Sequence, residues 1–533
     1  MNRKIWKALG IAVCMLALAA PRAMAERYEV GEDAPFIKFG DAVDKINKLG
    51  DTENEIVLMQ DITLEGEHTL KRNTTIKGKE GEDRKISING SGAGITVTGE
   101  KTTLNLGVNG YDKKLTIEGD TNVAFVTVSG GATANMYENV TLQNRQSTGN
   151  ACIVIMGPKS VFNMHGGVIE KCNGAVIADS GATFHMLSGE IKDCWVNGDG
   201  VISVNDGSKF IMEGGTISEC SAADDGGGLY AKNKSTITIN NGTISECRAA
   251  KKNGGGLYAD NSTINIEGGT ISGCTAVFGN GGGLYAKNSS TITISDGTIS
   301  GSTISGCEAG TGGGLYADGS TITIKGGTIS GCTARNNGGG LYATNSSTNS
   351  SIVTISGGTI SGCEANAGAG GGLCVVGSTL NIEDDIISEC FVSDSGKGGG
   401  LYAENSTLTI SGGTIKGNKA AYGGGVALVK SKVKVEEPIT NWTVVDNEAY
   451  KTDTGSGYIG GGIYLESGSM DVSNGSNKIY NNTADGHGAD ICLTDDTSSI
   501  KLPNAANMGA KYLDSGIYID GWYNDDNPRY TPS

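Results

Sequence analysis

One hexapeptide, Gly-Gly-Gly-Leu-Tyr-Ala, recurs along most of the second half of the chain. Near-identical copies begin at Gly226, Gly254, Gly281, Gly312, Gly338 and Gly398, and degraded copies begin at Gly370, Gly423 and Gly460. Most successive copies are about 26 to 32 residues apart, an interval typical of one structural repeat. The interval predicts a solenoid, in which each repeat stacks on the next and buries its apolar residues against it.

A second unit lies between the hexapeptides and reads Ser-Thr-Ile-Thr-Ile, followed by Gly-Gly-Thr-Ile-Ser-Gly-Cys. Each repeat therefore has three short β-prone runs separated by glycine turns. In the first copy the apolar residues alternate, so we expect Ile237 and Ile239 to face inward and Thr236 and Thr238 to face outward. These features predict an all-β parallel β-helix of about fifteen coils.

The segments outside the repeats divide the chain further. Residues 1–25 carry early cationic side chains, then an apolar run and a small-residue motif, which is the pattern of a secretory signal cleaved before Glu26. A membrane anchor is the alternative, although the apolar run is short for a membrane span. We expect an N-terminal cap over residues 26–89, the β-helix over residues 90–500 and a C-terminal cap or tail over residues 501–533.

One segment of the cap departs from the β pattern. Its apolar residues recur at helical spacing: Phe39, Ala42, Val43, Ile46 and Leu49. Gly50 follows as a stop signal, so a helix is predicted between residues 40 and 50. Such a helix would cover the open end of the β-helix, where backbone groups and apolar side chains are otherwise exposed.

The charge of the chain argues against one class of partner. The formal net charge is −17, and loss of residues 1–25, with four cationic side chains and no acidic ones, would make it −21. A chain this acidic is a poor ligand for nucleic acid. Because no later segment reaches transmembrane length, we expect an exported protein, secreted or held at the cell surface.

A column of cysteines is predicted at one corner of the coil. In eight of nine repeats, eight residues lead from an inward Met or Ile to a cysteine, and the ninth repeat contains a five-residue duplication. These nine residues, the cysteine column, are Cys172, Cys194, Cys220, Cys247, Cys274, Cys307, Cys332, Cys363 and Cys390. We interpret them as buried thiols that serve as small apolar side chains. Disulfides between neighbouring coils and a metal site are the alternatives.

The two repeated units resemble the glycine-rich repeats of right-handed parallel β-helix proteins of the pectin-lyase-like superfamily. They are most similar to the polymorphic outer-membrane protein repeats of secreted bacterial adhesins, over roughly residues 90–500. That family commonly has Phe-x-x-Asn at the corner, whereas this chain has Ile-x-x-Cys. Asparagine returns toward the C-terminus at Asn418, Asn447 and Asn482, and we assign Asn144 to the corner at the other end.

The resemblance implies a right-handed β-helix and two classes of function. The first is a non-enzymatic, adhesin-like binding protein that recognises a glycan or a host or cell-surface protein. The alternative is a carbohydrate-active enzyme on the same fold, either a polysaccharide lyase or a hydrolase. An enzyme of that kind needs paired carboxylates or a calcium and arginine cluster, and no catalytic residue is assigned from the sequence.

Two sets of residues are candidates for ligand binding. Five tyrosines occupy one position in consecutive repeats and are expected to form an outward aromatic strip: Tyr230, Tyr258, Tyr285, Tyr316 and Tyr342. Such a strip can pack on sugar rings or on a protein, although tyrosine can also simply shield the adjacent glycine turn. The loops between each corner cysteine and the next glycine triplet vary in length and sequence, which favours Asp224, Asp225, Lys251 and Lys252 as contacts.

Three acidic residues, Asp193, Glu219 and Glu246, directly precede column cysteines in consecutive repeats. Like charges stacked in this way repel, so the carboxylates either splay into water or share a cation. A calcium site is therefore possible, and no other cofactor is expected. The sequence gives no indication of the oligomeric state.

Overall fold

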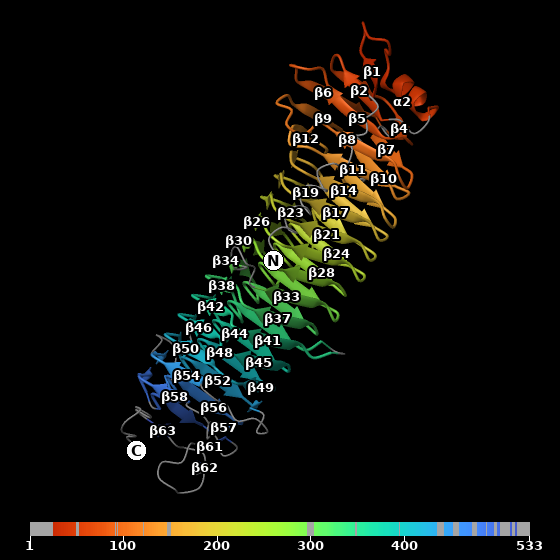
Figure 1. The fold of residues 1–533 in the computed structure, drawn as a ribbon. Coiled ribbons are helices and arrows are strands. Elements are labelled where there is room, and N and C mark those ends of the chain that lie inside the picture. The colour runs from red at the N-terminus through yellow and green to blue at the C-terminus, as the bar shows by residue number, and fades with distance from the viewer. Residues whose placement is uncertain are drawn as a thin grey trace, which may run out of the picture.

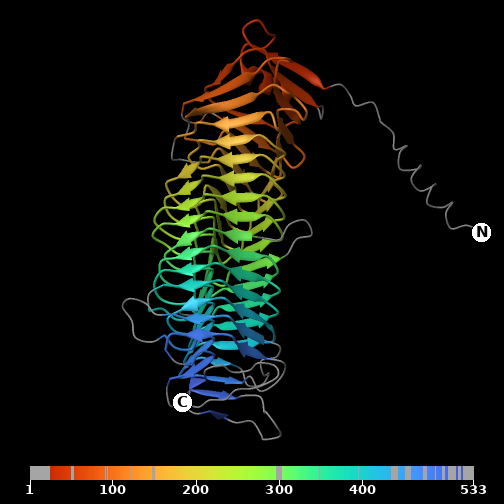
Figure 2. The same ribbon diagram turned by 90° about the vertical axis from the view of Figure 1, so that its left-hand side faces the viewer.

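The computed structural model describes residues 25–519 apart from residues 50–52, 91, 93, 121, 147–150, 296–302, 347–348, 394, 434–441, 451–457, 472–476, 487, 495–497, 502–511 and 514–517. These residues form a single long rod of stacked β-coils, with the N-terminal coils at one end and the C-terminal coils at the other (Figures 1 and 2). The predicted signal segment lies outside the described residues.

One coil contains four strands, each of which belongs to a different parallel sheet. In a central coil they are β24 (Leu229–Lys232), β25 (Thr236–Ile239), β26 (Thr243–Ser245) and β27 (Arg248–Ala249). We call the corresponding sheets I to IV in this order. Sheet III has 16 strands, which corresponds to about sixteen turns and agrees with the predicted fold. Sheet IV was not predicted, because a two-residue strand is too short to show alternation.

The coils stack in register, so identical residues form columns along the rod. Leu229 pairs with Leu257 and Tyr230 with Tyr258 in sheet I, and Ile237 pairs with Ile264 in sheet II. Ile237 is fully buried, whereas Thr236 and Thr238 are half-buried on the outer face. The predicted inward and outward faces of this strand are confirmed.

The predicted capping helix is α2 (Phe39–Asn47), the single helix among the described residues. It buries Phe39, Ala42, Val43 and Ile46 against the first coils, next to β1 (Glu26–Val30) and β4 (Glu67–Leu70). Its last residue anchors it, because the Asn47 amide donates to the Thr69 carbonyl at 2.7 Å and accepts from the Lys71 N–H at 2.9 Å. The helix therefore covers the open N-terminal end of the apolar core.

At the C-terminal end of the rod, the last two strands run antiparallel to their neighbours. β62 (Tyr512–Leu513) runs antiparallel to β61 (Ser499–Lys501), and β63 (Tyr518–Ile519) runs antiparallel to β60 (Ile491–Leu493). No helix in the described part of the chain is long and apolar enough to cross a membrane.

Candidate functional site

The corner between sheets III and IV has the same backbone geometry in successive coils. The residue before each column cysteine adopts a left-handed conformation, with φ of 56° at Asp193 and 54° at both Glu219 and Glu246. Later coils place glycine there, as at Gly273 and Gly331, because glycine adopts this conformation without strain. The left-handed conformation turns the backbone, so that the side chain of the following cysteine points into the core.

The cysteine column is buried in the core. Its nine thiols are at most 1% exposed, which confirms the predicted burial. The structure has every described cysteine as a free thiol. Each thiol has polar partners: Cys247 Sγ lies 3.9 Å from the Ile217 carbonyl of the preceding coil and 3.4 Å from the Ser245 carbonyl. Its hydrogen bond with the Cys220 thiol, together with burial, raises the pKa of Cys247.

Asparagine replaces cysteine at the same corner in the last three described coils. Asn447 Oδ1 accepts hydrogen bonds from the backbone N–H and the side-chain amide of Asn418, both at 3.0 Å. The Asn447 amide in turn donates to the Ile415 carbonyl at 3.0 Å. Asn482 continues the pattern, and Asp490 Oδ1 accepts from its amide at 2.9 Å. The asparagine column is therefore a continuous chain of buried hydrogen bonds.

The corner residue of the coil before Cys172 is not the one that we predicted. Asn144 takes the left-handed position, with φ of 61°, and Arg145 occupies the position that Cys172 holds in the next coil. Our assignment of Asn144 to the corner was wrong by one residue, because the alignment rested on residue type and not on strand register. Arg145 is fully buried, and its guanidinium donates to the Asn173 carbonyl at 2.8 Å.

The five tyrosines stack face to face on the outside of sheet I. Neighbouring ring centroids are 4.9 to 5.2 Å apart, and the ring planes differ by 3° to 25°. The rings point away from the core as predicted, but they do not form an exposed strip. Tyr258 is 1% exposed and Tyr285 is 7% exposed, because each ring is covered by its neighbours, and desolvation raises the pKa of both phenols.

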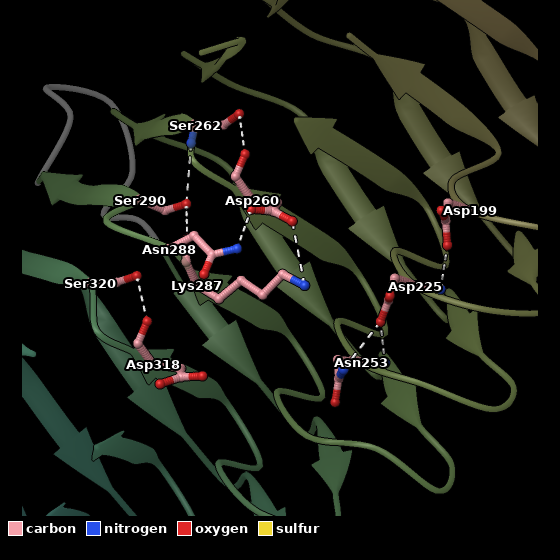
Figure 3. A network of polar contacts seen from close by, with 10 residues as sticks. All are labelled: Asp199, Asp225, Asn253, Asp260, Ser262, Lys287, Asn288, Ser290, Asp318 and Ser320. Carbon is pink, nitrogen blue, oxygen red and sulfur yellow. Dashed lines mark hydrogen bonds and ion pairs between the residues drawn. The ribbon is translucent and has the colours of Figure 1, made fainter. Parts of the chain in front are cut away.

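Polar side chains of neighbouring coils contact one another before and after the strands of sheet I (Figure 3). On one side, Lys287 pairs with Asp260 at 3.4 Å, and its ammonium lies 5.5 Å from the centre of the Tyr258 ring. Beyond this pair the Ser262 N–H donates to the Ser290 hydroxyl at 3.2 Å, and Ser262 Oγ donates to the Asp260 carbonyl at 2.9 Å. The sequence analysis missed this serine contact between coils, although the serine of each Ser-Thr-Ile unit was its signal.

The other side of the tyrosine column carries two aspartates in successive coils. Asp199 Oδ1 accepts from the Asp225 N–H at 3.1 Å, and Asp225 Oδ1 accepts from the Asn253 N–H at 2.8 Å (Figure 3). Asp225 is 8% exposed, so the structure does not place it on the surface as we expected. Burial, with Asp199 nearby, raises the pKa of Asp225. Asp225 thus holds neighbouring coils together.

Comparison with known families identifies the fold. The family described as the right-handed β-helix region matches residues 151–322 and 322–506, which cover more than half of the chain. The chain belongs to this right-handed β-helix family. No curated protein matches the chain.

The surface of the β-helix next to sheet IV consists of stacked loops. We call it the loop face and define it as residues 223–225, 250–253, 277–280, 310–311 and 335–337. Backbone hydrogen bonds join consecutive loops: the Lys251 N–H donates to the Ala223 carbonyl at 3.0 Å, and the Gly310 N–H donates to the Gly279 carbonyl at 2.7 Å. The loop face is therefore held by the same coil-to-coil contacts as the sheets.

Several side chains of the loop face project into solvent. Phe278 is 79% exposed, the highest value among the large exposed apolar side chains of the described residues. The Arg335 guanidinium donates to the Val277 carbonyl two coils away, which places it beside this loop. Lys251 and Lys252 are exposed in the preceding coil, where Lys252 lies 3.5 Å from Asp224. An exposed aromatic ring and cationic groups thus share one surface.

The candidate calcium ligands do not form a site. Asp193, Glu219 and Glu246 are exposed at the left-handed corner positions, each on its own coil. In the part of the β-helix that the structure describes, no three His, Cys, Asp or Glu side chains come close enough to hold a metal ion.

Proposed function

We propose that the protein is an exported, non-enzymatic binding protein, secreted or held at the cell surface, that recognises a glycan or a surface protein through the loop face. The observation that carries the proposal is the contrast between this surface and the rest of the rod. Residues of the sheets repeat from coil to coil, whereas the loops change in every coil while a rigid backbone holds them. Variable side chains on a rigid scaffold are the usual arrangement of a recognition surface.

The exposed side chains support the same conclusion. Phe278 can stack on a sugar ring or insert into an apolar pocket of a protein, and Arg335, Lys251 and Lys252 can pair with acidic groups around it. Aromatic and arginine side chains are also those that most often dominate binding energies. The likeness of the repeats to those of secreted adhesins agrees with this function.

The test is a binding screen followed by paired variants. The protein is screened on arrays of glycans and surface proteins, and the double variant Phe278→Ala with Arg335→Ala is then measured against each ligand found. We expect at least a tenfold loss of affinity with an unchanged melting temperature, because both side chains lie outside the core. Ile386→Ala is the matched control, since Ile386 is a 40% exposed apolar residue on sheet III and lies outside the loop face. Full binding by the double variant would refute the proposal.

The alternative function, a polysaccharide hydrolase, has one observation in its favour. Asp199 and Asp225 are carboxylates in successive coils, and a raised pKa, as at Asp225, suits a general acid. Release of sugars from a polysaccharide panel, abolished by Asp199→Asn and retained by the exposed Asp206→Asn control, would support it. The hydrogen bonds from Asn253 that already occupy Asp225 favour a structural role.

A further inference from the structure

The third glycine of each hexapeptide faces a column cysteine inside the same coil. A side-chain carbon added at Gly228, Gly256, Gly314, Gly340 or Gly372 would lie 3.1 to 3.2 Å from the Sγ atom of the corner cysteine that follows. The same position faces Asn447 in a later coil, where an added carbon at Gly425 would lie 3.0 Å from the amide. Glycine at this position therefore leaves room for the corner side chain.

Cys152 occupies this glycine position in an earlier coil. The register runs from Ile153 through Val176 and Ile202 to Leu229, which aligns Cys152 with Gly228. The corner residue of the same coil is Cys172, and both side chains are fully buried. No other coil of the described residues has cysteine at both positions, since alanine, valine or glycine faces the remaining column cysteines.

We propose that Cys152 and Cys172 form a disulfide that closes this coil across its interior. In a disulfide, Cβ of one cysteine lies roughly 3 Å from Sγ of the other, because the S–S bond is about 2.0 Å long. The distances at the equivalent glycines of five coils match this requirement. The two thiols also lie close enough for each to shift the pKa of the other.

The surroundings of the pair favour the reaction. Hydrogen bonds from the Cys152 and Cys194 thiols, together with the buried Arg145 guanidinium, lower the pKa of Cys172, so this residue is the better thiolate. Burial raises the pKa of Cys152. Because thiolates and not thiols attack disulfides, Cys172 is the attacking sulfur once the closing coil brings the two side chains together.

The oxidant is a low-molecular-weight disulfide such as glutathione disulfide, which acts before the coils close. The Cys152 thiolate attacks one sulfur and expels a glutathione thiolate. As the coil closes, the Cys172 thiolate attacks Cys152 Sγ, which expels the second glutathione thiolate. The two protein thiols lose two protons and two electrons, and one glutathione disulfide becomes two glutathione thiols.

The neighbouring pairs of the cysteine column differ from this pair. Column thiols lie one above another at successive corners, whereas Cys152 lies at the position that faces Cys172 within the same coil. A bond between two of them would join separate coils. The bond between Cys152 and Cys172 would instead close a short loop within a single coil.

Peptide mapping tests the proposal directly. The full chain is refolded with a mixture of oxidised and reduced glutathione, alkylated in denaturant without reductant and digested with trypsin. We expect residues 146–159 and residues 172–192 to appear as one linked peptide, with ten of the twelve described cysteines alkylated, two fewer than after reduction. A link between residues 172–192 and 193–209 would indicate a bond within the column and overturn the proposal, as would alkylation of all twelve.

A pair of variants provides the second measurement. Reductant should lower the melting temperature of the oxidised wild type by a few degrees and leave that of Cys152→Ala unchanged. Cys374→Ala, which removes a buried thiol that faces the tyrosine column, should keep the wild-type response. Equal responses of all three proteins would refute the disulfide. Because refolding supplies the oxidant, a negative result here would leave the proposed export and binding function untouched.

Discussion

The coils from Cys172 to Cys390 and the coils from Asn418 to Asn482 occupy the same inward corner position with different side chains. In the asparagine column, Asn447 Oδ1 accepts from the Asn418 N–H, and its amide donates to the Ile415 carbonyl. In the cysteine column, Cys247 Sγ contacts the equivalent Ile217 carbonyl. One sulfur atom therefore takes the place of an amide group at the same corner.

The difference lies in the strength of these contacts. The amide contacts are 2.9 to 3.0 Å long, whereas the distances from Cys247 and Cys363 Sγ to carbonyls of the preceding coil are 3.8 to 3.9 Å. A thiol is a weak donor and a small apolar group, so it stabilises mainly by filling space. A small inward side chain is therefore sufficient at the corners of the cysteine column, and hydrogen bonds add stability in the asparagine column.

The largest effect is expected from Asn447→Ala. The change leaves the buried Asn418 N–H and the Ile415 carbonyl without their partners, and we expect it to lower the free energy of unfolding by about 3 kcal/mol. Urea denaturation followed by circular dichroism measures this change. Asn366→Ala, on an exposed loop, is the control and should stay within about 0.5 kcal/mol of wild type. Equal effects of the two variants would contradict the hydrogen-bond argument.

A smaller effect is expected from Cys247→Ala. The variant loses a buried sulfur atom and weak polar contacts, so the free energy of unfolding should fall by only about 1 to 2 kcal/mol in the same assay. A loss as large as that of Asn447→Ala would mean that sulfur and amide contribute equally, and the comparison would fail.

The smallest effect is expected from Cys247→Asn, which transfers the asparagine pattern into the cysteine column. Gly228 faces Cys247 as Gly425 faces Asn447, so the amide has room and can reach the Ile217 carbonyl. We expect a change within about 1 kcal/mol, since a new hydrogen bond offsets the lost apolar contact. A loss above that of Cys247→Ala would show that the two columns are not interchangeable.

The sequence was most informative where one residue type repeats at a fixed spacing. The eight-residue step from an inward Met or Ile to each cysteine predicted the burial of the column, because parallel coils must stack in register. The exposure of the tyrosines could not be predicted from such spacing. Alternation indicates which face of a strand a residue occupies, but the cover over Tyr258 comes from Tyr230 and Tyr285 in other coils.

Two further features depended on register, which local patterns do not give. Cys152 lies outside the regular spacing of the cysteine column, and only the register from Ile153 to Leu229 through two intervening strands aligns it with Gly228. Asn144 was confused with the corner residue because it lies one position before Arg145. In both cases the missing information was the pairing of one coil with the next.

The direction of the coil-to-coil hydrogen bonds has a mechanical consequence. These bonds run along the long axis of the rod, and the two ends of the β-helix lie far apart (Figure 2). A force that pulls the ends apart loads the bonds of a terminal coil first, and that coil can peel away while the remaining ones stay folded. Each released coil of roughly 27 residues would increase the distance between the two pulled ends by about 90 Å. Under tension, the protein would therefore extend in discrete steps set by its repeat length.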